Sequence, residues 1–228
     1  RQSGPEQVAQ NPGEKGGTWE RRLIEENGNF ESGELCDLDG DGKKLEILPA
    51  VTATVWYEPD GKGGIAKHVI CDKPMRWGHG VGDVNGDGRP DVLRPDVWFE
   101  APADPRNGQW VEHPLDLCNL KDGGRGDAAQ ILVYDVNADG VPDILASAAH
   151  NYGIYWYQQT RHEGGESTWE RHLIDDTWSQ SHSLALADMD GDGDMDLVSG
   201  KRFMAHNGGD PGEMDPPGVY WYALDRKA

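Results

Sequence analysis

Four acidic loops share one sequence pattern, and their side-chain oxygens are suited to bind a cation. Each loop has Asp at its first position, Asp or Asn at the third, Asp at the fifth and Gly at the sixth. The glycine permits a sharp turn that brings the side-chain oxygens together, and a hard cation needs six to eight such oxygens. Calcium tolerates irregular geometry better than magnesium, so we expect three to four Ca²⁺ sites. The loops begin at Asp37, Asp83, Asp135 and Asp188.

The last three loops also have Asp at the ninth position, and their seventh position can offer a backbone carbonyl. The first loop departs from this pattern, because Leu45 occupies its ninth position and Glu46 follows one residue late. We therefore expect its site to be distorted or weaker. The predicted ligands are Asp37, Asp39 and Asp41; Asp83, Asn85, Asp87, Arg89 and Asp91; Asp135, Asn137, Asp139, Val141 and Asp143; and Asp188, Asp190, Asp192, Asp194 and Asp196.

Two other interpretations of the loops were weighed. An EF-hand requires Glu at position twelve and a helix after it, but that position holds Leu48, Arg94, Ala146 and Ser199, and β-type residues follow. We reject the EF-hand on both counts. Plain Asx turns without a metal ion stay an alternative, most of all for the first loop.

The elements that position these loops repeat with them. The loops follow one another at steps of 46, 52 and 53 residues, and a period near 50 with short strand-like runs indicates a repeat architecture. Each repeat has a small apolar run before the loop, a short apolar run after it, an aromatic alternation such as VWFE, and a Trp-x-x-His run. No segment has a helical period. We predict an all-β fold, a β-propeller of four-stranded blades with four blades visible.

We expect one domain over residues 1–228, with blade units at roughly 19–60, 61–103, 104–160 and 161–228. The run that starts at Trp19 matches the fourth strand of a blade, and the chain ends with an aromatic third strand. Pairing of the two would close a four-blade ring and remove the exposed sheet edges. Alternatively, residues 1–18 look like a connection between blades, and the chain is then part of a larger propeller.

Charge and composition exclude several classes of partner. The formal net charge of −20 argues against nucleic acid and against an anionic membrane surface. No run of 18 apolar residues exists, so we expect no membrane insertion. The three cysteines are too few for a disulfide scaffold. The chain starts at Arg1 without a signal peptide, so we expect a mature product or a fragment.

The stretches DVNGDGRPDVL, DVNADGVPDIL and DMDGDGDMDLVSG resemble FG-GAP/VCBS repeats, the calcium-loop blades of integrin-type and many bacterial secreted β-propellers. The resemblance covers nearly the whole chain. It implies calcium in the turns and a secreted protein, extracellular or periplasmic. Propeller enzymes of the aldos-2-ulose dehydratase group have similar repeats. Function is not fixed by this resemblance, because such blades occur in adhesion proteins, binding modules and enzymes.

Residues that break the repeat mark the expected functional face, which lies opposite the acidic loops. The histidines and tryptophans that recur in the strands are interpreted as structural. The connection from Lys201 to Pro217 is the longest of its kind, and long loops in compact repeats often carry ligand sites. The candidates are His79, His150, His182 and Lys201 for catalysis, and Arg76, Trp77, Trp178, Arg202, His206 and Asn207 for ligand binding.

Three functions remain open for this face. The first is binding of a glycan or protein ligand, in which aromatic rings stack on sugars and polar groups meet hydroxyls and carboxylates. The second is a carbohydrate lyase or dehydratase that abstracts a proton and eliminates a leaving group. The third is a structural module with further blades or domains in the same parent chain. A Zn²⁺ ion at the histidines is a further alternative, and the tripeptide Arg125–Asp127 is discounted as an integrin-binding motif.

Overall fold

The computed structural model describes residues 9–11, 17–19, 21–26, 33–43, 46–49, 53–118 and 127–226. Over these ranges the chain forms strands and connections and no helix, so the all-β prediction is confirmed. The strands coincide with short runs of β-branched and aromatic residues between Gly and Asp turns, which suit a half-buried pleated surface. In the described part of the chain no helix is long and apolar enough to cross a membrane.

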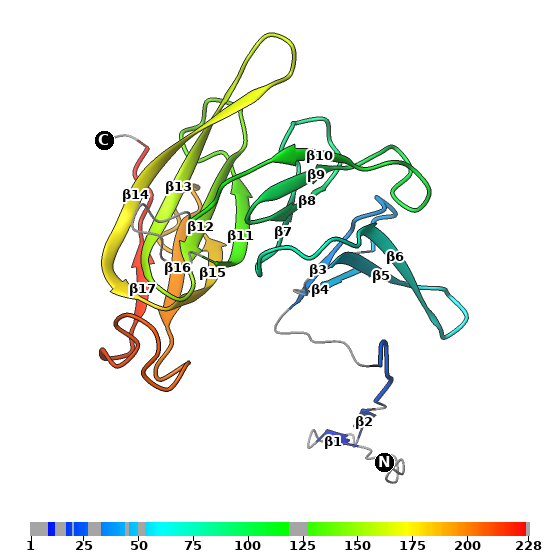
Figure 1. Ribbon diagram of the computed structural model, residues 1–228, viewed down its shortest axis with the longest axis horizontal. Helices are drawn as coiled ribbons and strands as arrows, with labels where there is room; N and C mark the ends of the chain where they lie inside the picture. The colour runs from blue at the N-terminus through cyan, green and yellow to red at the C-terminus, as the bar shows by residue number, and fades with distance from the viewer. Residues whose placement is uncertain are drawn as a thin grey trace.

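Four antiparallel sheets follow one another in chain order as the blades of a propeller (Figure 1). Each begins with the strand before an acidic loop, and the first three end with the Trp-x-x-His strand. The fourth sheet has three strands. The first blade has β3 (Gly33–Cys36), β4 (Glu46–Pro49), β5 (Thr54–Pro59) and β6 (Ile65–Cys71), and the second has β7 (Gly80–Gly82), β8 (Asp91–Arg94), β9 (Val97–Glu100) and β10 (Val111–Pro114). The third has β11 (Ala128–Tyr134), β12 (Asp143–Ala148), β13 (Tyr152–Arg161) and β14 (Ser167–Ser179), and the fourth has β15 (Ser181–Ala187), β16 (Asp196–Lys201) and β17 (Val219–Tyr222).

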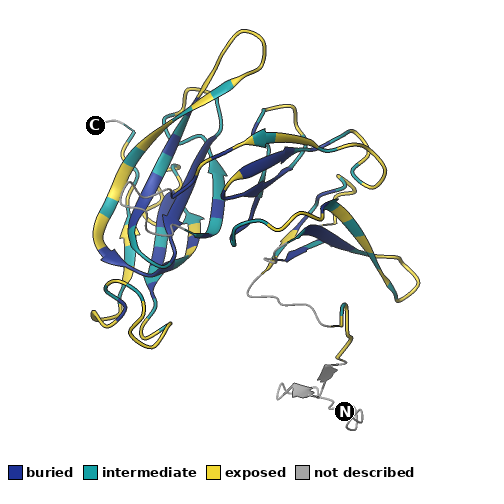
Figure 2. Ribbon diagram, viewed as in Figure 1, coloured by how far each residue is buried: buried dark blue, intermediate teal, exposed yellow. Residues whose placement is uncertain are grey.

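Three apolar cores hold neighbouring blades together, and the buried residues concentrate in the facing sheets (Figure 2). Trp56 and Phe99 belong to the core between the first two blades, and Leu93 and Tyr155 to the core between the second and third. Burial of such side chains is the main favourable term that docks one sheet on the next. Cys36, Cys71 and Cys118 are buried and form no disulfide.

A tryptophan–histidine stack recurs in the first three blades. Each Trp of the third strand lies opposite the His of the fourth, and the ring centroids are 4.1–4.5 Å apart. An acid or amide two residues after the Trp contacts the imidazole, as Glu100 does with His113 at 2.8 Å. The structural interpretation of these residues is therefore confirmed. The three pairs are Trp56 with His68, Trp98 with His113, and Trp156 with His172.

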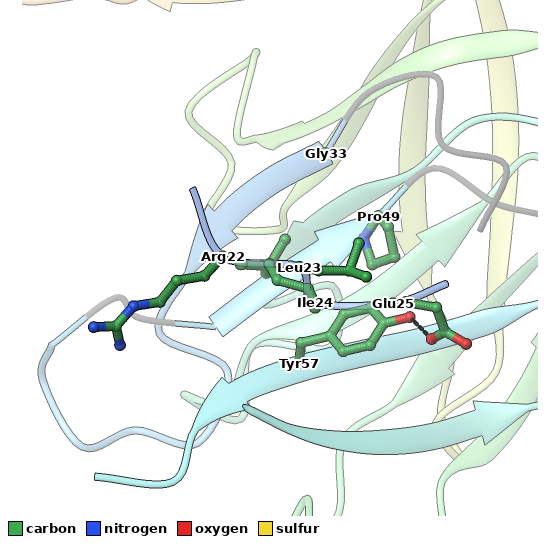
Figure 3. Close-up of a pocket in the computed structure, with 8 residues that line it drawn as sticks. Arg22, Leu23, Ile24, Glu25, Gly33, Pro49 and Tyr57 are labelled. Carbon is green, nitrogen blue, oxygen red and sulfur yellow. Dashed lines mark hydrogen bonds between the residues drawn. The ribbon is translucent and has the colours of Figure 1, made fainter. Parts of the chain in front are cut away.

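The predicted closing pair of strands is not formed. Strand β2 (Gly17–Trp19) pairs with β1 (Ala9–Asn11), and among the described strands β17 pairs with β16 alone. The segment that follows β2 instead lies against the first blade (Figure 3). There Glu25 accepts a hydrogen bond from Tyr57 and forms an ion pair with Lys67. Both contacts place the segment on the first blade and not beside β17.

This segment lines a shallow pocket of about 400 Å³ on the first blade. Leu23 and Ile24 face Pro49 and the ring of Tyr57 there, as Figure 3 shows. The hydrogen bond drawn in the figure joins Tyr57 and Glu25, and Arg22 extends from the other end of the segment. The segment from Arg22 to Glu25 thus covers part of one face of the first blade.

Candidate functional site

The acidic loops fold around their own side-chain oxygens. In the second loop Asp83 accepts hydrogen bonds from the backbone N–H groups of Asp87 and Gly88, at 3.0 and 2.8 Å. The third and fourth loops repeat the bond to the glycine N–H with Asp135 and Asp188. The glycine at the sixth position has a φ between +83 and +98°, a conformation that residues with a Cβ rarely adopt. The four glycines are Gly42 (φ 84°), Gly88 (87°), Gly140 (83°) and Gly193 (98°).

The side chains at the first, third and fifth positions converge in the first and fourth loops. One oxygen from each carboxylate lies within 4.8 Å of the others in both sets. Loops two and three have Asn at the third position. In both loops the Asn side-chain amide donates a hydrogen bond to the Asp at the fifth position. The two converging sets are Asp37, Asp39 and Asp41, and Asp188, Asp190 and Asp192.

The ninth-position carboxylates have a second task. Asp91 is fully buried and accepts hydrogen bonds from Val84 N–H at 2.9 Å and Ala101 N–H at 2.8 Å. Asp143 and Asp196 make the equivalent pairs of bonds. Each carboxylate thus fastens its loop to the end of the third strand. Asp196 Oδ2 also accepts a hydrogen bond from Trp221 Nε1 at 2.9 Å.

Glu46 takes this place in the first loop. Its Oε2 accepts a hydrogen bond from Leu38 N–H at 3.0 Å, which corresponds to the bond between Val84 and Asp91 in the second loop. The longer Glu side chain reaches from one residue further along the chain. Leu45, the residue at the ninth position itself, lies outside the described residues.

The donor set of the loops fits a calcium ion. It consists of carboxylate, amide and backbone oxygens, which are the ligands that Ca²⁺ prefers. Asp37 Oδ1 is buried and has no hydrogen-bond partner among the described atoms. Burial raises the pKa of Asp91 to about 6, and nearby Asp87 and Asp83 act in the same direction. A cation would offset this crowding of negative charge.

Three of the predicted histidines meet at the other end of the sheets, between the third and fourth blades. His150 follows β12, His182 lies in β15, and His206 lies in the connection between β16 and β17. The Nε2 atoms of His150 and His182 are 3.3 Å apart, and the ring centroids of His150 and His206 are 4.7 Å apart. Antiparallel pairing puts these connections opposite the acidic loops. We call His150, His182, His206 and Asp210 the blade 3–4 site.

Asp210 and Gln180 order this site. Asp210 Oδ2 is 2.6 Å from His206 Nδ1 and accepts a hydrogen bond from Gln180 Nε2 at 3.2 Å. Gln180 Oε1 accepts a hydrogen bond from Arg202 at 3.0 Å. Gln180 is fully buried and has a φ of +67°, a conformation that costs free energy for a residue with a Cβ. The fold keeps this conformation while the side chain bridges Asp210 and Arg202.

The site favours neutral imidazoles. Burial lowers the pKa of His182 to about 4, and the positive charge of Arg202 adds to this effect. Burial also lowers the pKa of His150. At neutral pH both rings therefore carry a free nitrogen lone pair that can accept a proton or bind a metal ion.

Other predicted residues lie outside the blade 3–4 site. His79 is buried, pairs through its backbone with Ile131 at 2.8 Å, and has a pKa lowered to about 4 by burial and by Arg94. Arg76 donates to Leu117 O at 3.2 Å and lies 3.6 Å from Asp127. Trp77 is half-buried.

Two of the predicted residues serve the fold in this structure. Lys201 is buried, and its ammonium group donates to Gly212 O at 2.7 Å, which ties down the base of the long connection. Trp178 belongs to the core of the last two blades and stacks on Tyr220 with centroids 4.4 Å apart. Its ring face is thus already covered by Tyr220. Asn207 sits in a turn of the long connection with a φ of +56°.

Asp210 was missed as a site residue in the sequence, and the importance of Gln180 was not recognised. A signal existed for Asp210, because it follows His206 by four residues in the longest connection. No sequence signal marks Gln180, since its role comes from a strained backbone between two blades. Asp127, which lies 3.9 Å from His150, was considered as part of a tripeptide whose first two residues lie outside the described ranges.

Comparison with known families agrees with the fold. The family model described as FG-GAP-like repeat matches residues 122–199, which contain the whole third and fourth acidic loops. This match agrees with the blades that the structure shows. Residues 122–199 are an FG-GAP-like repeat segment of a chain that folds as a β-propeller. No curated protein matches the chain.

Proposed function

We propose that this β-propeller is a secreted, calcium-stabilised binding protein whose blade 3–4 site takes a glycan that bears a carboxylate. The observation that carries the proposal is the convergence of His150, His182 and His206 with Asp210 from three separate connections. Structural histidines of this chain stack on tryptophan inside a blade, whereas these three lie at the junction of two blades.

The chemistry of the site suits such a ligand. Arg202 lies beside the histidines and favours a carboxylate, while Asp210 and the imidazole nitrogens can bind sugar hydroxyls. His206 has a side chain that is 46% exposed, so a ligand can reach the site from solvent. Since Trp178 is covered by Tyr220, the polar groups rather than an aromatic platform would provide most of the recognition.

Glycan binding can be measured directly. We expect uronate-containing oligosaccharides to bind in calorimetric titrations, and we expect His182→Ala to weaken binding at least tenfold, or about 1.4 kcal/mol. His162→Ala is a matched control, because His162 is an exposed histidine on the β13–β14 hairpin whose only side-chain bond is to Thr168. Failure of every acidic glycan to bind, with a folded protein, would leave a protein ligand or a structural module.

A second candidate function is a carbohydrate lyase or dehydratase at the same site. The lowered pKa of His182 and His150 leaves a neutral imidazole at pH 7 that can remove a proton next to a carboxylate. Arg202 would stabilise the negative charge that develops there. Elimination products absorb in the ultraviolet, so turnover is visible in a spectrophotometer. Binding without any such absorbance would favour the binding protein.

Calcium at the acidic loops is proposed as a folding ligand. The convergence of loop oxygens and the buried, unpartnered Asp37 Oδ1 support this assignment. An ion that binds the folded state alone adds stability by mass action. Residence outside the cytoplasm follows as part of the proposal, because millimolar calcium is common there. An unchanged melting temperature after chelation with EGTA would contradict calcium binding.

A further inference from the structure

We propose that His150, His182, His206 and Asp210 bind one divalent transition-metal ion of the zinc class, which joins the third blade to the fourth. The inference rests on the proposed function only in sharing its site, because metal binding is measured without a glycan. It is separate from the acidic loops, which lie at the opposite end of the sheets.

The donor atoms distinguish this site from the calcium loops. Three imidazole nitrogens and one carboxylate oxygen suit zinc, whereas calcium prefers an all-oxygen set. Imidazole binds a metal ion through the lone pair of a ring nitrogen, and His150 and His182 bring their Nε2 atoms together at 3.3 Å. The ligand side chains of the acidic loops are carboxylates and amides, with Glu46 in the first loop, so the two kinds of site should select different ions.

The distances agree with metal coordination. Ligand atoms of His150, His206 and Asp210 all lie within 4.8 Å of one another. His182 lies outside this group and adjoins it through His150, so its ring must move toward His206 and Asp210 to complete the set of four ligands. The Nε2 atoms of His150 and His182 are 3.3 Å apart, and two ligands of a tetrahedral zinc with bonds of about 2.0–2.1 Å are separated by about 3.3–3.4 Å. The pair that must open is His206 and Asp210, now 2.6 Å apart, by less than about 1 Å.

Residues behind the ligands hold them in place, as in known metal sites. Gln180 donates a hydrogen bond to Asp210 Oδ2 and so orients that carboxylate. Asp127 Oδ2 lies 3.9 Å from His150 Nδ1, on the side of the ring away from His182. This distance is too long for a hydrogen bond. A closer approach of Asp127 on metal binding would orient the ring with Nε2 toward the ion. Asp127 and Asp210 also offset the charge of the ion, which Arg202 opposes.

The proposed ligands come from two different blades, so an ion bound by them would connect these blades. His150 follows β12 in the third blade, whereas His182, His206 and Asp210 belong to the fourth. One ion therefore links two blades that otherwise meet through an apolar core.

The test is a zinc titration by calorimetry with the full chain in excess Ca²⁺, so that the acidic loops are saturated. We expect one Zn²⁺ per chain. We expect His206→Gln and Asp210→Asn each to weaken binding by about tenfold or more. Cobalt is a second probe, because Co²⁺ in a tetrahedral site of nitrogen and oxygen donors gives an intense visible absorption that the same variants should remove.

Controls separate the site from other histidines and from the loops. His162→Gln should leave zinc affinity unchanged, and excess Ca²⁺ keeps the acidic loops occupied throughout the titration. The melting temperature without zinc shows whether each variant is folded, and His206 is exposed enough for its variant to fold. No zinc binding, or binding that survives both His206→Gln and Asp210→Asn, would overturn the inference. Glycan binding by zinc-free protein would then still support the proposed function, whereas zinc binding without glycan binding would overturn that function alone.

Discussion

The histidines of this chain differ by what surrounds them. In the first three blades they stack on tryptophan and contact an acid or amide, which fixes the edge of the sheet. At the blade 3–4 site His150 contacts both His182 and His206. His79 is a third kind: it is 3% exposed, and its Nδ1 has no partner among the described atoms. The surroundings of a histidine in this fold therefore differ from one position to the next, and only some of these positions lie where a ligand could reach them.

His79 gives a prediction about pH. Burial and Arg94 lower its pKa from 6.5 to about 4 in the folded protein. Between these values the unfolded chain takes up a proton that the folded chain does not, so stability falls as pH is lowered from 6.5 to 4 and is fully present above 6.5. The contribution is up to roughly 3 kcal/mol, from 1.36 kcal/mol per pKa unit. We expect His79→Gln to lose stability less steeply over this window.

Chemical denaturation at several pH values between 4 and 7 measures this effect. The comparison of wild type with His79→Gln isolates one group, since other buried histidines and carboxylates titrate in both proteins. His162→Gln serves as the control and should follow the wild-type profile, because His162 is exposed. Parallel profiles for wild type and His79→Gln would show that His79 is not a buried neutral residue.

At the scale of elements, arginines tie each of the first three acidic loops to the next blade. Arg106 pairs with Asp39 of the first loop, Arg161 donates to Val84 O of the second at 2.8 Å, and Arg226 donates to Val136 O of the third at 2.9 Å. In the third and fourth blades the arginine follows the strand tryptophan by five residues. The arginines thus extend the contact between blades beyond the apolar core.

We predict that Arg161→Ala lowers the free energy of unfolding by about 1 kcal/mol, because a charged donor to a backbone carbonyl is lost at a solvent-exposed position. Lys62→Ala changes a basic residue on the corresponding hairpin of the first blade and should have no measurable effect. Urea denaturation of the two variants provides the comparison. Equal stabilities would mean that the arginine contact contributes nothing to docking of the blades.

At the scale of the whole molecule, stability depends on four blades that cannot bury their faces alone. Cores form between neighbours, and the acidic loops fasten strand to strand within each blade. Strand β17 keeps an open edge, with Val219 82% and Trp221 50% exposed. The fourth blade is therefore the least completed unit of the described chain, and the loop ion there should matter most.

Calcium dependence tests this directly. We predict that EGTA lowers the melting temperature by roughly 5–10 °C for each site that is saturated at about 100 times its Kd. Asp192→Ala should reduce this shift more than Asp41→Ala, because the first loop lacks the ninth-position Asp. Differential scanning calorimetry with and without EGTA gives the ranking. Similar losses in the two variants would show that Glu46 replaces that Asp completely.

The repeat, the strands and the acidic loops could be predicted because they depend on local sequence. A loop such as Asp83–Asp91 contains all of its predicted ligand oxygens within nine residues. Its glycine permits the sharp turn without any contact from the rest of the fold. Alternation of apolar and polar residues likewise fixes which face of a strand is buried. Sequence alone thus determined the fold class and the candidate calcium ligands.

Only the tertiary structure decided which unrepeated residues act together. His150, His182 and Asp210 are separated by up to 60 residues and come close because two blades dock. Trp178 and Lys201 are unrepeated residues of the same kind of connection, but the structure uses them for packing and for a backbone hydrogen bond. Whether the first Trp-x-x-Arg run would close the ring was also undecided until the contacts of Glu25 placed it on the first blade. Such contacts depend on long-range packing, which local spacing does not encode.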